Sequence, residues 1–381
     1  MWLVAAQWVA LALAGGLIAG WTGISISLVE ILVGVAAGNC LGLATNHWVD
    51  FLAGFGSILL TFLAGAEVDP RVLRTKFKEC SAIGIAGFLL PFLGALAYAY
   101  YIAGWDLRAA EIAGVALSTT SVAVVYAVMV ETGSNETELG QVILAACFIN
   151  DLGTVLALGI LFANFSYWML VFALVTAAVL AAAPRLTRWV IDRYGNRIGQ
   201  LEIRYLFLLL LFLGGLANLA NSEAVLPAYL LGLAVAGFFL EERDLLHRLR
   251  ALSFAVFTPF YFLKAGLFVS LPAVVSGAGL VLAALLTKMA AKFVGVWPVT
   301  AAFRFSPHEG TYTTLLMCTG LTFGTISALF GLNHGLIDRV QYTVLVTAII
   351  LSAIVPTMIA QAFFRPEARP AETQGRMRRE A

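Results

Sequence analysis

The sequence has few charged residues. Only 12% of its 381 residues are Asp, Glu, Lys or Arg, whereas a soluble domain carries about 25%. Hydrophobic residues make up 61% of the chain, and the mean hydropathy is +0.92. A soluble fold of this composition would be hard to keep in solution, so the shortage of charge points to a membrane protein.

The chain also lacks the marks of several functional classes. A net charge of +1 gives no sign of a nucleic-acid partner, and no GxxxxGK[ST] loop offers a site for ATP phosphates. The four cysteines have no paired spacing of a metal or redox motif, so we expect them to be packing residues and expect no bound cofactor. They are Cys40, Cys80, Cys147 and Cys318.

Apolar runs long enough to cross a bilayer, about 20 residues each, recur along the whole chain with short polar connections. We therefore predict an all-α integral membrane domain over residues 1–364. The first run lacks a basic segment before it and a clear cleavage site, so we interpret it as a spanning helix. The thirteen predicted spans lie at about 3–20, 26–43, 50–66, 81–103, 109–129, 139–163, 166–183, 203–220, 225–240, 252–271, 276–302, 311–331 and 340–364.

The distribution of Lys and Arg predicts the orientation, because basic residues near span ends stay on the cytoplasmic side. Eighteen of the 23 basic residues fall in alternate connections and in the tail, and the opposite side has only Arg108 and Arg339. We therefore expect an extracytoplasmic N-terminus and a cytoplasmic C-terminus in the cell's inner membrane. The polar residues 365–381 form the predicted cytoplasmic tail, which we expect to be disordered.

Thirteen spans allow two six-span repeats around one central span, and the odd span gives the second repeat inverted topology. The fifth and twelfth spans, which correspond in the two repeats, are rich in hydroxyl residues and glycine at their centres. Helices of this kind can break, and broken helices at corresponding places indicate a transporter binding site. Close packing of small residues is the alternative. The two centres are Leu117–Ser121 and Thr319–Ser327, the second with Thr322, Gly324 and Thr325.

Asp151 is the strongest candidate for a functional residue. It lies about twelve residues, or ~18 Å, from either end of the sixth span, too deep for its side chain to reach water at a membrane surface. A carboxylate held there gains stability from either a proton or a cation, so one group can serve two competing ions. A structural role in a buried ion pair is the alternative.

Neighbouring polar residues can complete an ion site. Asn150 offers either a carbonyl oxygen to a cation or an amide that holds broken helices open, with simple packing as the alternative. Thr119, Thr120 and Ser121 can supply hydroxyl or carbonyl oxygens, which suit a hard monovalent cation. The residues alone do not choose among these three.

Three lysines lie inside spans. Lys288 and Lys292 are four residues apart on the eleventh span and so share a helix face. A lysine there can neutralise Asp151 when no cation is bound, or can instead serve backbone carbonyls or another acid. We expect Lys264 to have a structural role. Two acids, Glu30 and Glu67, fall near span ends, where anchoring or dimer contacts are expected.

At these residues the chain resembles the bacterial monovalent cation/proton antiporters, the superfamily of sodium/proton exchangers and potassium-efflux proteins. The resemblance covers almost the whole membrane domain and depends on the order of five short strings. These are Leu28-Val-Glu-Ile-Leu-Val-Gly34, Phe62-Leu-Ala-Gly-Ala-Glu67-Val-Asp69, Thr119-Thr-Ser-Val-Ala123, Phe148-Ile-Asn-Asp151 and Lys292-Phe-Val-Gly295.

The resemblance implies a dimerisation domain and a core domain, the latter at about 81–163 and 276–364, with two crossed discontinuous helices and an elevator-like movement of the core. It implies Asp151 as the ion-binding carboxylate, Lys292 as its basic partner, and a homodimer. Because members with Asn before the Asp tend to be electroneutral, Asn150 implies electroneutral exchange of Na⁺, or of K⁺ or Li⁺, for H⁺. Electroneutral members often carry Arg at the position where this chain has Lys292.

Two rival functions follow from the same features. A cation-coupled solute symporter also uses inverted repeats and broken helices, but its site needs a larger polar lining than these residues provide. An intramembrane aspartyl protease needs two carboxylates that share a proton, and only Asp151 is expected to lie deep. We therefore predict a secondary antiporter without enzymatic activity.

Overall fold

A computed structural model describes residues 2–366, except for 23, 163–166, 195–199, 221, 223, 241, 270 and 273–276. Every regular element within these residues is a helix. Ten helical segments are long and apolar enough to cross a membrane, and two shorter apolar helices accompany them. The chain is therefore a multi-pass membrane protein. The predicted disorder of the tail concerns mainly residues 367–381, which lie outside the described residues.

Helices of the N-terminal half coincide with the first six predicted spans. Their order is α1 (Trp2–Thr22), α2 (Ile26–Cys40), α3 (His47–Ala66), the short α4 (Pro70–Thr75), α5 (Phe77–Ala97) with the π-helical turn η1 (Tyr98–Ile102), α6 (Leu107–Ser118), α7 (Val122–Thr132), the 3₁₀ turn η2 (Ser134–Glu136) and α8 (Glu138–Phe162).

The C-terminal half follows the remaining seven predicted spans. The tenth span has no separate start near residue 252, because the helix of the connection before it continues into the span without a break. The order is α9 (Tyr167–Tyr194), α10 (Leu201–Leu219), α11 (Val225–Phe239), α12 (Arg243–Leu252) joined through η3 (Ser253–Phe257) to α13 (Thr258–Leu267), α15 (Ala278–Ala302), α16 (Pro307–Met317), α17 (Thr322–Asn333) and α18 (Arg339–Phe363).

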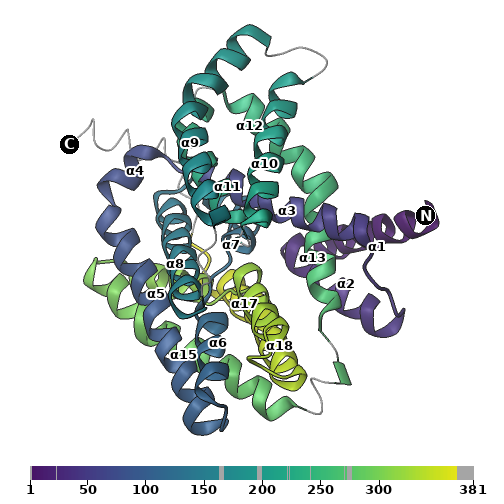
Figure 1. Cartoon of the computed structure of the whole chain (residues 1–381), viewed down its shortest axis with the longest axis vertical. Coiled ribbons are helices and arrows are strands. Elements are labelled where there is room, and N and C mark those ends of the chain that lie inside the picture. The colour runs from purple at the N-terminus through teal and green to yellow at the C-terminus, as the bar shows by residue number, and fades with distance from the viewer. Residues whose placement is uncertain are drawn as a thin grey trace.

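The helices form two groups. We name the first the site bundle: α5, α6, α7, α8, α15, α16, α17 and α18, in which α5 packs on α6, α8 and α15, and α15 packs on α16 and α18. The second, the flanking bundle, contains α1, α2, α3, α9, α10, α11, α12 and α13. Figure 1 shows α1, α2, α3 and α13 on one side of the site bundle and α9, α10 and α12 above it.

Close helix crossings in the flanking bundle have the arrangement expected of two repeats. The second span, α2, packs against the tenth, α13, and the third, α3, packs against the ninth, α11. Gly34 and Gly266 lie at the first crossing, and Gly65 and Gly232 lie at the second. A Cβ atom at any of the four would overlap a backbone carbonyl oxygen of the facing helix. Each repeat thus supplies one glycine to each crossing, which matches the symmetry of two inverted repeats.

Replacing Gly232 by alanine tests these crossings. The added methyl would overlap the carbonyl oxygen of Phe62 on α3, and such overpacking costs about 1–3 kcal/mol. We expect Gly232→Ala to lower the unfolding temperature of the detergent-solubilised protein. Gly237→Ala, on the same helix with no atom near its added methyl, should leave that temperature unchanged or raise it, because alanine favours helix. Equal temperatures for the two variants would contradict the crossing.

Candidate functional site

The two predicted broken helices are confirmed, and their breaks meet inside the site bundle. The fifth span ends as α6 at Ser118 and resumes as α7 at Val122, and the twelfth ends as α16 at Met317 and resumes as α17 at Thr322. The backbone N–H of Ser121 donates to the carbonyl oxygen of Thr319 at 3.0 Å. Unwound backbone in a membrane protein must find partners of this kind, because lipid offers none.

Thr120 adds a second link between the breaks. Its hydroxyl donates to the carbonyl oxygen of Met317 at 2.8 Å, so it satisfies the end of α16. Thr119 instead donates its hydroxyl back to the carbonyl oxygen of Ala116, on its own helix, at 2.9 Å. Both threonines are fully buried. Of the two, Thr120 is therefore the residue whose side chain joins the broken helices.

Asn150 holds the first break in place from α8. Its side-chain oxygen accepts the backbone N–H of Thr120 at 2.9 Å, and its amide nitrogen donates to the carbonyl oxygen of Ser118 at 3.4 Å. Asn150 thus satisfies a donor and an acceptor that the interrupted helix leaves free. These bonds place the Asn150 amide against the broken helix, and a role as cation ligand stays a prediction.

Lys288 and Lys292 reach the same break from α15. The Lys288 ammonium donates to the carbonyl oxygen of Thr119 at 3.0 Å, and the Lys292 ammonium donates to the hydroxyl of Thr120 at 2.8 Å. Positive charge at the C-terminal end of α6 is favourable, because carbonyl oxygens are exposed there. Both lysines are fully buried, and no carboxylate pairs with either in the described part of the chain.

Asp151 follows Asn150 on α8, and 5% of its surface is exposed. Its Oδ1 oxygen is buried and has no hydrogen-bond partner among the described residues. A buried carboxylate oxygen without a partner is costly, because nothing replaces the water that it has lost. The site therefore contains one acceptor that a proton or a cation can satisfy.

The second broken helix contributes in three ways. The hydroxyls of Ser121 and Thr322 lie 3.2 Å apart, so the two breaks also meet through side chains. A Cβ atom at Gly324 would lie 2.8 Å from the Thr119 hydroxyl oxygen, and glycine therefore permits the close approach. Thr325 donates its hydroxyl back to the carbonyl oxygen of Leu321 at 2.8 Å and lines a cavity.

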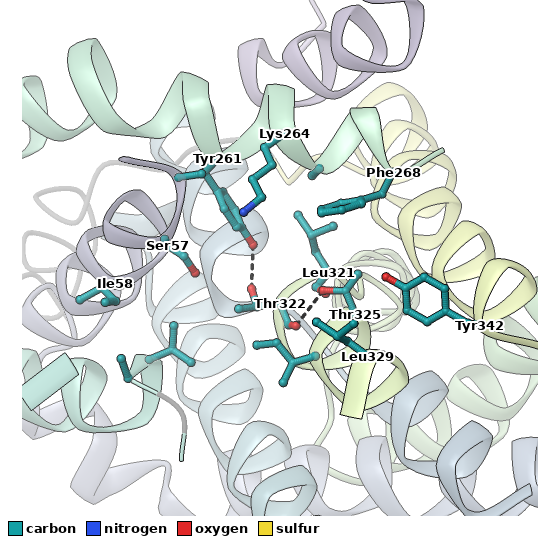
Figure 2. Close-up of a pocket in the computed structure, with 16 residues that line it drawn as sticks. Ser57, Ile58, Tyr261, Lys264, Phe268, Leu321, Thr322, Thr325, Leu329 and Tyr342 are labelled. Atoms are coloured by element: carbon teal, nitrogen blue, oxygen red, sulfur yellow. Dashed lines mark hydrogen bonds between the residues drawn. The ribbon is translucent and has the colours of Figure 1, made fainter. Parts of the chain in front are cut away.

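Tyr261, on α13, was not predicted as a site residue. Its hydroxyl lies 2.7 Å from the hydroxyl of Thr322 and connects the flanking bundle to the second break (Figure 2). A tyrosine within an apolar run gives no sign in the sequence that it reaches another helix. Lys264, one turn later, forms an ion pair with Asp50 at 2.7 Å, which agrees with its predicted structural role.

Glu67 is the C-cap residue of α3 and anchors that span end, one of the two roles expected for it and for Glu30. Glu67 contacts other parts of the same chain: it accepts hydrogen bonds from Tyr126 and Asn135 and pairs with Arg250. Glu30 is only 3% exposed, so it is more deeply buried than its position near a span end suggested. Asp151 is thus not the only buried acid, although the protease reading still lacks a second carboxylate paired with it among the described residues.

Replacing Asn150 by alanine tests its support of the first break. Loss of the side chain leaves the N–H of Thr120 without its partner, at a cost of about 1–3 kcal/mol. We expect Asn150→Ala to lower the unfolding temperature more than Thr154→Val does. Thr154 is also buried on α8, but its hydroxyl only donates to its own helix at 3.3 Å. If the two substitutions lower the unfolding temperature equally, Asn150 does not support the first break.

Comparison with known proteins agrees with this geometry. Residues 9–365 match the family described as "Sodium/hydrogen exchanger, transmembrane". The chain is 26% identical over 351 residues to "Probable Na(+)/H(+) antiporter 3" of Methanocaldococcus jannaschii, covering 89% of each chain. It is 27% identical over 371 residues to "Na(+)/H(+) antiporter" of Enterococcus hirae, covering 90% of this chain and 92% of that protein.

A solved structure has the same fold. The chain superposes on the sodium proton antiporter MjNhaP1 from Methanocaldococcus jannaschii, determined at pH 8, with a TM-score of 0.66 and 16% sequence identity. The match covers 96% of this chain and 99% of that one. With the two crossed broken helices and the family match over most of its length, the chain belongs to the sodium/hydrogen exchanger family of transmembrane proteins.

Proposed function

We propose that the protein is a secondary antiporter that exchanges a monovalent cation for H⁺ at Asp151. The observation that carries this proposal is the buried Oδ1 oxygen of Asp151, which has no partner among the described residues. Either ion satisfies that oxygen, and both cannot do so at once. Competition for one carboxylate is sufficient to couple the two fluxes when only occupied forms change conformation.

Sodium is the favoured cation. Two of the relatives above are described as Na⁺/H⁺ antiporters, and a third, "Na(+)/H(+)-K(+) antiporter GerN" of Bacillus cereus, is 20% identical over 373 residues. Potassium and lithium are the other candidates. Oxygen ligands suit all three ions, and a carboxylate, hydroxyls and freed carbonyl groups are what the site offers. The Thr120 and Ser121 hydroxyls are already hydrogen-bonded, so Asp151 is the main ligand.

We propose alternating access by movement of the site bundle against the flanking bundle. The core domain predicted at 81–163 and 276–364 contains the helices of the site bundle. Polar contacts join the bundles at one end, where Glu131 of α7 accepts the backbone N–H groups of Ile26 and Ser27. Hydrogen bonds of this kind can exchange their protein partner for water when the bundles part, which suits a contact that closes one side of a transporter.

The proposal includes electroneutral exchange. Asn150, which precedes Asp151, carries no charge and uses its side chain to support the first break. Lys292 has an oxygen partner, the Thr120 hydroxyl, that does not depend on Asp151. On this proposal the lysine keeps its proton throughout the cycle, so that one cation exchanges for one proton. Extracytoplasmic placement of the N-terminus, an inner-membrane location and a homodimer remain predictions.

The Asp151→Asn variant tests the site. In everted vesicles with an imposed pH gradient, we expect Na⁺ to dissipate the gradient for the wild type and to have no effect for the variant. K⁺ and Li⁺ should be tested in parallel. Asp338→Asn is a matched control, since Asp338 only caps α18 and Asn caps helices equally well. No response of the wild type to any of these cations would favour a cation-coupled solute symporter.

Membrane voltage tests the stoichiometry. An electroneutral cycle moves no net charge, so an imposed potential of either sign should leave the rate of Na⁺/H⁺ exchange in proteoliposomes unchanged. Moving one extra charge per cycle would instead couple the exchange to about 2.3 kcal/mol per 100 mV. A rate that follows the sign of the potential would show that Lys292, or another group, releases a second proton.

A further inference from the structure

Two sulfur atoms meet where the second broken helix packs against α8. The Cys147 thiol on α8 donates to the thioether sulfur of Met317, the last residue of α16, at 3.6 Å. Both residues are fully buried. Cys147 belongs to the sixth span and Met317 to the twelfth, so the pair exists only because α8 and α16 are in contact in the fold.

This sulfur pair lies close to the candidate carboxylate. Cys147 and Asp151 are four residues apart on α8, which is about one turn, or ~6 Å along the helix axis. Residues at this spacing share a helix face. The carbonyl oxygen of Met317 accepts the Thr120 hydroxyl at 2.8 Å. One sulfur therefore shares a face with Asp151, and the other belongs to a residue that links the two breaks.

A glycine on α5 makes room for the Met317 side chain. A Cβ atom at Gly87 would lie 3.0 Å from the Met317 methyl carbon, so a larger residue there would crowd the thioether. The next residue after Met317, Cys318, is fully buried and is a free cysteine. Two sulfur-bearing residues thus stand at the end of α16, and Cys147 contacts the first of them.

A thiol and a thioether are the ligands that soft monovalent metal ions prefer. Cysteine and methionine select Cu⁺ over harder ions, Ag⁺ has the same preference, and both ions accept as few as two ligands. Zn²⁺ needs a larger set, usually four. Among the described residues, no group of three or more His, Cys, Asp or Glu could hold a metal ion. The sulfur pair therefore suits a soft two-coordinate ion.

Replacing the Cys147 proton by such an ion adds no charge to the buried site. The metal ion binds the thiolate sulfur, the S–H bond breaks, the proton leaves as H⁺, and no electron is transferred. The sulfur–metal unit is as neutral as the thiol was, so the high cost of burying an uncompensated charge does not arise. Lys292, which interacts electrostatically with Cys147 and Cys318, meets no additional positive charge.

We propose that Cys147 and Met317 form a binding site for a soft monovalent metal ion of the class of Ag⁺ and Cu⁺. The flexible methionine side chain lets the two sulfur atoms move apart to admit the ion. A soft ion that reaches Asp151 is captured one helix turn away, because sulfur suits it better than a carboxylate oxygen does. The bound metal ties α8 to the end of α16. The second break then cannot adjust around an ion at Asp151, and exchange slows.

Silver binding tests the site without relying on transport. Ag⁺ is added to the purified, detergent-solubilised protein in chloride-free buffer, in a Cys40→Ser background that removes the exposed thiol. Excess free methionine displaces weakly held metal, and the silver retained after desalting is measured by mass spectrometry. We expect a single Ag⁺ ion per chain. Met317→Leu should raise the half-saturating Ag⁺ concentration about tenfold or more, because two ligands on one protein bind at high effective concentration.

Matched controls come from the same residue types elsewhere in the fold. Cys80 is a buried free cysteine, and Met129 is a buried methionine on α7. Cys80→Ala and Met129→Leu should keep the affinity of the background protein for Ag⁺, whereas Cys147→Ala should lose it. Leucine conserves the volume of methionine, so Met317→Leu should fold, which its unfolding temperature without metal will check. Equal Ag⁺ affinity in Met317→Leu and the background would leave Cys147 and Met317 as packing residues only.

Exchange assays separate this inference from the proposed antiport. In everted vesicles of the Cys40→Ser background, Ag⁺ should lower the rate of Na⁺/H⁺ exchange relative to the metal-free rate. The same Ag⁺ concentration should leave Met317→Leu at its own metal-free rate. Silver bound by Cys147 and Met317 in a protein that exchanges no cation would overturn the antiport and support the metal site. An active protein that binds no Ag⁺ would do the reverse, and binding without inhibition would contradict the effect on the second break.

Discussion

The crossing of the two broken helices is the interaction on which the site depends. Interrupting a helix inside a membrane frees backbone groups that lipid cannot satisfy. Here the backbone of the two breaks bonds across the crossing, from Ser121 to Thr319, and side chains satisfy other freed groups. Asn150 serves Thr120 and Ser118, and Lys288 serves Thr119. Asp151 follows Asn150 on α8, so the helix that supports the first break also carries the candidate carboxylate.

The two lysines and Asp151 have separate roles in this arrangement. The two lysines donate hydrogen bonds to oxygen atoms of the first break. Their positive charge therefore stabilises the C-terminal end of the interrupted helix. Asp151 retains a buried oxygen without a described partner. Neither lysine forms an ion pair with Asp151 among the described residues, so this carboxylate oxygen stays open to the ion exchange proposed above.

The two bundles meet in different ways at their two ends. At one end, hydrogen bonds of Glu67 and Glu131 join α7 and its following turn to α2 and α3. At the other end the bundles are separated by a cavity, with the Tyr261–Thr322 contact at its floor. Polar contacts can exchange a protein partner for water between two states, whereas an apolar core has no such replacement.

The sequence by itself determined the membrane class, the spans, the two breaks and Asp151 as the candidate carboxylate, because hydropathy, hydroxyl-rich span centres and a buried acid are local patterns. It also brought Asn150, Lys288 and Lys292 to attention, but it could not choose their partners. Only the tertiary structure decided that Lys292 contacts Thr120, that Glu67 bonds within the chain and that Tyr261 reaches Thr322. Those contacts join helices far apart in the sequence, and which side chains meet depends on helix rotation and depth, which no local spacing specifies.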